Sequence, residues 1–162
     1  MLSDCSYRCG AKESHLKSLF ALLCIVLVAG CSTPLFKPKI ALRELAFEVV
    51  AGANDNSPFA IELVSTSDDD LLKKLQALSA AQWFDGQANI KRDFPTLTFD
   101  YYELTPGQDM TLRPTKFTNK PGKGLLLFAN YKTPGQHRLR LETLHKAKII
   151  FAADAIRVDA LP

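Results

Sequence analysis

Cysteine carries the most reactive side chain in this sequence, and all four cysteines fall within its first 31 residues. Cys5 and Cys9 could form a metal or redox pair, but their spacing is not a standard ligand pattern. Cys31 differs because it directly follows Val28-Ala29-Gly30, at the end of an apolar run. The thiolate of cysteine is a nucleophile, so covalent attachment of a lipid to Cys31 is the first chemistry that the sequence suggests.

The residues before Cys31 have the pattern of an export signal. A modestly basic stretch comes first, with Arg8, Lys12 and Lys17. The apolar run Leu19 to Gly30 follows and is about a dozen residues long, whereas a membrane-spanning helix needs roughly 20. This order is typical of a signal peptide, and the run LVAGC resembles a bacterial lipobox. We predict a lipoprotein signal peptide over residues 1–30, cleaved before an acylated Cys31.

An ordinary secretory signal or a short uncleaved anchor is the alternative. The cysteine distribution favours the lipoprotein, because a chain that starts at Cys31 keeps no other cysteine and needs no disulfide in an oxidising compartment. The net charge of +3 is too small for a nucleic-acid footprint, so we expect no nucleic-acid partner. Apolar residues make up 47% of the chain, which argues against general disorder.

The rest of the sequence divides into a tether and one domain. Residues 31–39 contain Pro34 and Pro38, which fix φ and lack a backbone donor, and we interpret them as a lipidated tether. Residues 40–162 are long enough to enclose one hydrophobic core. We expect them to form a single domain.

Seven or so short segments of this domain have the pattern of strands, separated by turn residues. Alternation of apolar and polar residues indicates half-buried strands, as in LRELAFEVV, FAIELVST, PTLTFDYYELTPGQDMTLRP and HRLRLETL. KIIFAADAIRV closes the domain with one more predicted strand. GLLLFANYKTPG instead begins with a continuous apolar run, which is typical of a strand covered on both faces. Many short strands with regular turn signals predict a mainly β, two-sheet antiparallel β-sandwich.

One segment changes to helical spacing. Ser67 and the following aspartates could cap a helix and suit its positive end, and leucines recur in LLKKLQALSAAQWF at the spacing of an amphipathic helix. We therefore predict one short inserted helix that ends near Trp83 to Gly86. Trp83 and Phe84 should pack this helix onto the sheets; an exposed aromatic partner site is the other interpretation.

The remaining polar residues do not form a recognisable catalytic or metal-binding pattern. His137 and His145 have no cysteine partner, and a zinc site needs three or four ligands, so we interpret them as surface residues. Asp68 to Asp70 lack the spacing of a calcium loop and fit a helix start. Gly122-Lys123-Gly124 is too short for a phosphate loop and reads as a turn before a strand. We expect no metal, no cofactor, no small-molecule substrate and no enzymatic activity.

The order of these features resembles the TssJ (SciN) family of outer-membrane lipoproteins of type VI secretion systems. The lipobox is followed by a first strand, an Asn-bearing loop, and Ser57-Pro58 before the second strand. A short helix ending in aromatic residues, Trp83-Phe84, comes next. The run YELTPGQDMTL then supplies a Pro-Gly turn, and LLLFANYK supplies a late apolar strand. The resemblance extends from Cys31 to the C-terminus.

The resemblance implies a transthyretin-like β-sandwich held at the outer membrane, facing the periplasm, by acyl and diacylglyceryl groups on Cys31. Ser32 after the cysteine resembles the outer-membrane sorting signal. The implied partner is the periplasmic domain of the inner-membrane protein TssM. The implied contact loop comprises Gly52, Asn54, Asp55, Asn56 and Ser57. A plain surface turn is the alternative for this loop.

Two other functions compete with this interpretation. One is a pilotin-like or other assembly lipoprotein of a different secretion or pilus system. The other is a periplasmic enzyme or ligand carrier, which would need a deep polar pocket. The resemblance favours the structural lipoprotein of a secretion complex.

Overall fold

A computed structural model describes residues 37–161 of the chain. The predicted signal peptide, Cys31, Ser32 and most of the predicted tether lie outside these residues. The last residues of that tether are already bonded to the domain: the Pro38 carbonyl accepts a hydrogen bond from the Gly122 amide at 3.0 Å, and Lys39 forms a β-bridge with Pro121. Across residues 37–161, no helix is both long and apolar enough to cross a membrane.

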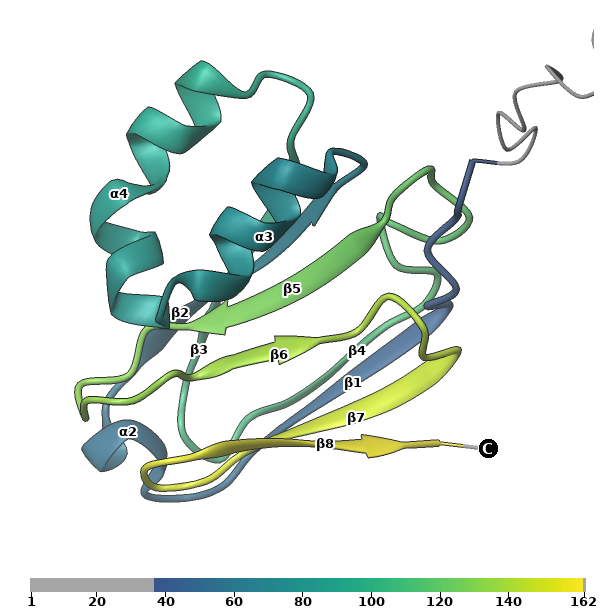
Figure 1. Ribbon diagram of the computed structural model, residues 1–162. Helices are drawn as coiled ribbons and strands as arrows, with labels where there is room; N and C mark the ends of the chain where they lie inside the picture. Colours follow the sequence, from purple (N-terminus) through teal and green to yellow (C-terminus); the bar gives the residue numbers. More distant parts are fainter. Residues whose placement is uncertain (1–36, 162) are drawn as a thin grey trace, which may run out of the picture. The chain divides into compact units, whose positions relative to one another are not determined.

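Eight strands between residues 37 and 161 form two four-stranded sheets (Figure 1). The first sheet has the order β4-β1-β7-β8 and contains β1 (Glu44–Val49), β4 (Asp109–Leu112), β7 (Lys146–Phe151) and β8 (Ile156–Ala160). The second has the order β3-β2-β5-β6 and contains β2 (Phe59–Thr66), β3 (Thr98–Leu104), β5 (Gly124–Ala129) and β6 (Arg138–Arg140). The predicted β-sandwich is confirmed.

One strand pair departs from the predicted antiparallel arrangement. Strands β1 and β7 pair in parallel, with Glu44 opposite Lys146 and Val49 opposite Phe151. Every other pairing between named strands is antiparallel. Because a parallel pair needs a long connection, this sheet joins the beginning of the domain to its last third.

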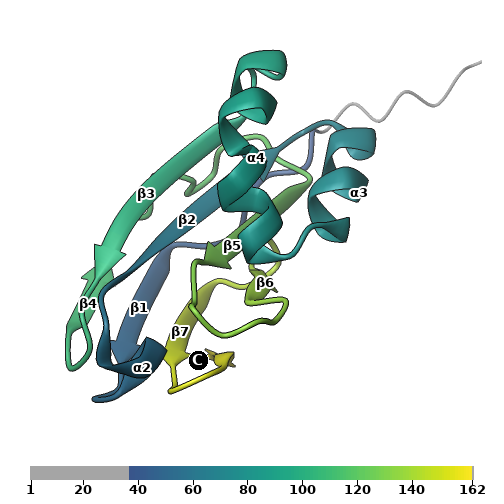
Figure 2. The same ribbon diagram turned by 90° about the vertical axis from the view of Figure 1, so that its left-hand side faces the viewer.

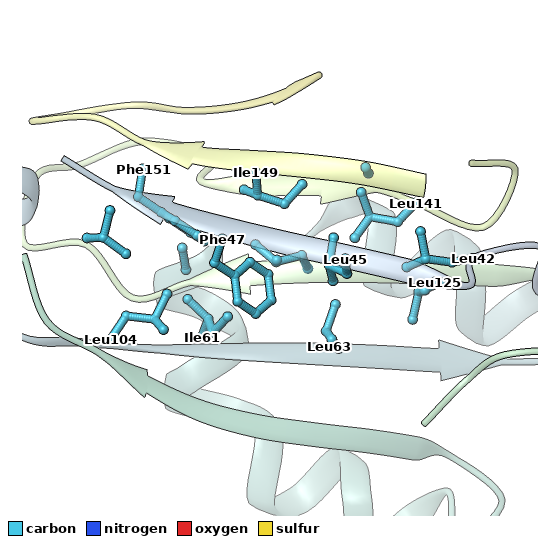
Figure 3. Close-up of a cluster of buried hydrophobic side chains, with 14 of the residues drawn as sticks. Leu42, Leu45, Phe47, Ile61, Leu63, Leu104, Leu125, Leu141, Ile149 and Phe151 are labelled. Atoms are coloured by element: carbon cyan, nitrogen blue, oxygen red, sulfur yellow. The ribbon is translucent and has the colours of Figure 1, made fainter. Parts of the chain in front are cut away.

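The main core lies between the two sheets (Figure 3). Alternate residues of β1 are buried, which places Leu45, Phe47 and Val49 inside. Ile61 and Leu63 from β2 face them from the second sheet. Burial of such side chains contributes about 1.5–3 kcal/mol each relative to exposure, so the period-two pattern of the sequence fixes which face of each strand turns inward.

The second sheet is covered on its outer face as well, by two helices (Figure 2). These are α3 (Asp69–Ala77) and α4 (Ala80–Asp93). Leucines of α3 and Trp83 of α4 pack on Val64, Leu126 and Phe128 of the sheet. This second cover explains why β5 is buried along its whole length, as its continuous apolar run predicts.

The helical segment is thus two helices rather than the predicted single one. Leu78 leaves helical geometry, with φ −78° and ψ 141°, and Ser79 then starts α4 as its N-cap. The Ser79 hydroxyl accepts from the Gln82 amide while the Gln82 side chain accepts from the Ser79 amide, which is a capping box. At the start of α3, Asp68 accepts from the Leu71 amide at 2.8 Å, so the three aspartates begin a helix as predicted.

The sandwich has two distinct ends (Figure 1). The chain enters at Lys37, and residues 37–43, 113–123 and 141–145 meet there through backbone hydrogen bonds; we call this the entry end. The opposite end carries the short helical turn α2 (Ala53–Asn56), the β3–β4 turn, the β5–β6 loop and the β7–β8 turn; we call this the loop end.

Candidate functional site

The loop between β1 and β2 folds as a compact left-handed turn. Gly52 has φ 87°, and Asn54, Asp55 and Asn56 have φ of 51°, 55° and 50°. Glycine adopts positive φ without steric cost, and Asn and Asp tolerate it better than other residues. The residue types that predict a turn here therefore also fix its unusual conformation, α2.

Asn54 holds this turn against two other segments, through its side chain and its backbone amide. Asn54 is buried, with 2% of its surface exposed. Its Nδ2 donates to the carbonyls of Ser57 at 3.2 Å and Pro58 at 3.4 Å. Its Oδ1 accepts from the backbone amide of Lys132 at 2.6 Å, and its backbone amide donates to the Ala153 carbonyl at 3.0 Å. Asn54 therefore joins the β1–β2 loop to the β5–β6 loop and the β7–β8 turn.

Lys132 strengthens the same junction from the β5–β6 loop. Its Nζ donates to Ser57 Oγ at 2.6 Å and lies 3.9 Å from Asp55 Oδ2. Sequence reasoning missed Lys132, because nothing in NYKTPG indicates that this residue returns to a loop 75 positions earlier. The resulting network holds both loops in one conformation.

The structure brings the five predicted contact residues together but gives them different exposure. Asp55 and Asn56 are exposed, and Gly52 and Ser57 are half-buried. Asn54 is almost fully buried. The accessible polar groups of this loop are therefore those of Asp55 and Asn56, and Asn54 positions them.

An aromatic pair supports the neighbouring loops. Tyr131 stacks on His137 with ring centroids 4.8 Å apart, and its hydroxyl donates to the Ala152 carbonyl at 2.8 Å. Burial, with a smaller effect of Asp154, raises the pKa of Tyr131 above its usual value. His145 is exposed at the entry end, so the two histidines do not share a site. The described part of the chain contains no group of three His, Cys, Asp or Glu residues that could hold a metal ion.

A second polar cluster lies beneath α4, on the outer face of the second sheet. Glu62 of β2 is fully buried, and its Oε2 accepts from Trp83 Nε1 at 2.9 Å. Its Oε1 accepts from Lys91 Nζ at 2.5 Å. Trp83 stacks on Phe128 of β5, with centroids 5.1 Å apart. Trp83 thus packs the helix onto the sheet, as predicted.

Comparison with known proteins places this fold. No protein-family model and no curated protein sequence matches the chain. The structure of the type VI secretion lipoprotein TssJ1 from Pseudomonas aeruginosa matches with a TM-score of 0.59 and 17% identity, over 75% of this chain and 95% of that one. The chain has the TssJ fold.

Two further structures of type VI secretion proteins match the same fold. Lip from Serratia marcescens, a membrane-bound component of the type VI secretion system, matches with a TM-score of 0.52 and 16% identity, over 72% of this chain and 95% of that one. A chain in a structure of the type VI protein TssM C-terminal domain from EAEC matches with a TM-score of 0.55 and 12% identity, over 74% of this chain and 98% of that one. At these identities the likeness establishes the fold.

Proposed function

We propose that this chain is a TssJ-type lipoprotein of a type VI secretion membrane complex, anchored in the outer membrane through an acylated Cys31 and docked on the periplasmic domain of a TssM-like inner-membrane protein. The observation that carries the proposal is the fold match, which spans 95% of TssJ1 and 95% of Lip. Both of those proteins are components of type VI secretion systems.

The sequence before the domain supports the anchor. The LVAGC motif ends six residues before Lys37, the first residue of the described domain. A single buried acyl chain binds a membrane only marginally, at about 0.8 kcal/mol per CH₂, and stable anchoring needs a second signal. Acyl and diacylglyceryl groups on one cysteine supply several chains, so the anchor would be effectively permanent.

The position of the α2 loop supports the docking role. Strand β1 has six residues, which span about 20 Å, and it runs from the entry end to α2. The exposed side chains of Asp55 and Asn56 therefore project from the end remote from the predicted anchor. This end can therefore face a partner that approaches from the opposite membrane.

The network around Asn54 supports docking by a preorganised loop. A loop already held in its bound conformation avoids the entropic cost of ordering when a partner binds. Asn54 and Lys132 connect the loop to two other segments by hydrogen bonds of 2.6 to 3.0 Å, and the Asn54 side chain also bonds within the loop at 3.2 and 3.4 Å. Asp55 and Asn56 thus form a polar surface on a loop of fixed conformation.

Binding of the periplasmic fragment of the TssM-like protein from the same genome tests the docking role by calorimetry. We expect affinity in the micromolar range or tighter, and about tenfold weaker binding for Asp55→Asn/Asn56→Gly. These replacements remove the contact groups while tolerating positive φ. The control Asp85→Asn/Asn89→Ala changes exposed residues of α4 and should bind normally. Absence of binding at tens of micromolar would overturn the docking role.

Metabolic labelling with palmitate tests the anchor separately. The unchanged protein should incorporate label and fractionate with the outer membrane, whereas Cys31→Ser should do neither. An unlabelled native protein would refute the lipoprotein assignment, whatever the result of the binding measurement.

A further inference from the structure

Four exposed cationic side chains gather at the entry end without an ion-pair partner among residues 37–161. They are Lys37, Lys39, Arg43 and Lys120; we call them the basic patch. Backbone contacts hold them together: Lys39 bridges Pro121, and the Ile40 amide donates to the Lys120 carbonyl at 3.0 Å. The Arg43 amide donates to the His145 carbonyl at 2.8 Å, so the exposed imidazole of His145 lies at this end as well.

The acidic residues near the basic patch are mostly engaged elsewhere. Asp69 pairs with Lys123, and Asp70 lies 3.2 Å from Lys73. Asp68 accepts from the Leu71 amide at the start of α3.

Two more carboxylates of the entry end are also paired. Glu44 pairs with Arg113, and Glu142 pairs with Arg140. The local acids are therefore largely balanced by cations outside the basic patch, and the patch gives the entry end an excess of positive charge.

We propose that the basic patch binds the anionic phosphate headgroups of the membrane that holds the lipid anchor. This inference rests on the proposed acylation of Cys31, which lies six residues before Lys37. Six residues span at most about 20 Å, so the anchor keeps Lys37, the nearest member of the patch, within about two Debye lengths of the bilayer surface. Confinement by so short a link also gives a high effective concentration of headgroups.

The charge of the basic patch suits this ligand. Each Lys or Arg near an anionic bilayer raises the affinity of the protein for that bilayer by roughly fivefold, and the effect falls off within a Debye length. Four such side chains on one end can hold that end against the lipid, where a flexible tether alone would let the domain tumble. The β1–β2 loop, at the opposite end, is then directed away from the membrane.

Lysine footprinting tests the basic patch on the whole protein. The chain is purified from the bacterial envelope with its lipid and reconstituted into vesicles of phosphatidylcholine alone, or of phosphatidylcholine mixed with phosphatidylglycerol. A water-soluble amine-acylating reagent then labels exposed lysines, which mass spectrometry quantifies. We expect labelling of Lys37, Lys39 and Lys120 to fall several-fold in the anionic vesicles only, while Lys132 at the loop end is unchanged.

Salt and matched variants sharpen this test. The protection should disappear at about 1 M salt, where the Debye length is about 3 Å. Arg43→Gln/Lys120→Gln should weaken the protection of Lys37 and Lys39. Lys73→Gln/Lys74→Gln, which removes the same charge from the exposed face of α3, should not. Equal labelling in the two kinds of vesicle at low salt would overturn the inference.

The mass of the purified protein tests the lipid anchor independently of the basic patch. A mass without acyl groups refutes the anchor, and flotation of the unanchored chain then tests the basic patch on the same vesicles. Stronger flotation with the anionic vesicles than with the neutral ones supports the patch, and equal flotation refutes it.

Discussion

Replacing Glu62 with leucine should lower the free energy of unfolding by about 3 kcal/mol, because two buried partners lose their acceptor. Breaking a buried ion pair typically costs 3–5 kcal/mol. The side chain of Lys91 keeps 21% exposure and a second acceptor, Gln87, at 2.5 Å, which places the ion-pair loss at the low end. Trp83 Nε1–H then stays unsatisfied, and the burial of leucine offsets part of that cost.

The double variant Glu62→Leu/Lys91→Met isolates the interaction between the two charges. Lys91→Met alone should cost about 2 kcal/mol, and the double variant also about 2 kcal/mol, since an apolar pair can replace a buried ion pair. The coupling energy is therefore about 3 kcal/mol.

Urea unfolding followed by the fluorescence of Trp83, the only tryptophan in the chain, measures these free energies. Lys73→Met removes an ion pair with Asp70 whose side chains are 75% and 86% exposed, and should change stability by less than about 0.5 kcal/mol. If the two single losses simply add in the double variant, the charges do not interact as the structure indicates.

Two further perturbations test the loop end and two tyrosines, Tyr131, which is buried, and Tyr102, which is half-buried. Asn54→Ala should lower the free energy of unfolding by about 2–3 kcal/mol, because the Lys132 amide loses its acceptor. The control Asn56→Ala changes a residue with the same positive φ and should cost only about 1 kcal/mol. Equal losses in urea unfolding would contradict the role of Asn54. Burial is the main cause that raises the pKa of Tyr102 and Tyr131 above 10.0. Above about pH 10 the unfolded chain therefore binds fewer protons than the folded protein, and the free energy of unfolding should fall as the pH rises. Tyr131→Phe should flatten that fall in unfolding measured from about pH 9 to 11, and an unchanged slope would rule the explanation out.

Alternation in the sequence predicts most of the sandwich, because the burial of one strand face is a local property of the residues. It places Leu45 and Phe47 on the inner face of β1 and Ile61 on that of β2, as observed. It also places Glu62 on the opposite face, but it does not reveal that helices cover that face. A carboxylate in an alternating strand usually meets water, and only the fold shows that this one meets Trp83.

Other features depend on contacts between distant segments or on signals that are easily overlooked. The break between α3 and α4 is readable, because Ser79 and Gln82 have the spacing of a capping box, yet no glycine or proline interrupts the run from Leu71 to Phe84. The β1–β2 loop is predictable as a turn from its Gly, Asn and Asp residues. The burial of Asn54 cannot be predicted from the sequence, because it depends on contacts with Lys132 and the Ala153 carbonyl.

The parallel pairing of β1 with β7 sets the order in which this protein can fold. Glu44 and Lys146 are neighbours across the pair, although almost the whole domain separates them in the sequence. A chain that emerges N-terminus first, from a ribosome or through a translocation channel, must therefore hold β1 without β7 until the last strands appear, although β4 can pair with the other edge of β1 earlier. Pairings between such distant segments form slowly, so threading and any modification near the N-terminus can be completed before the domain closes.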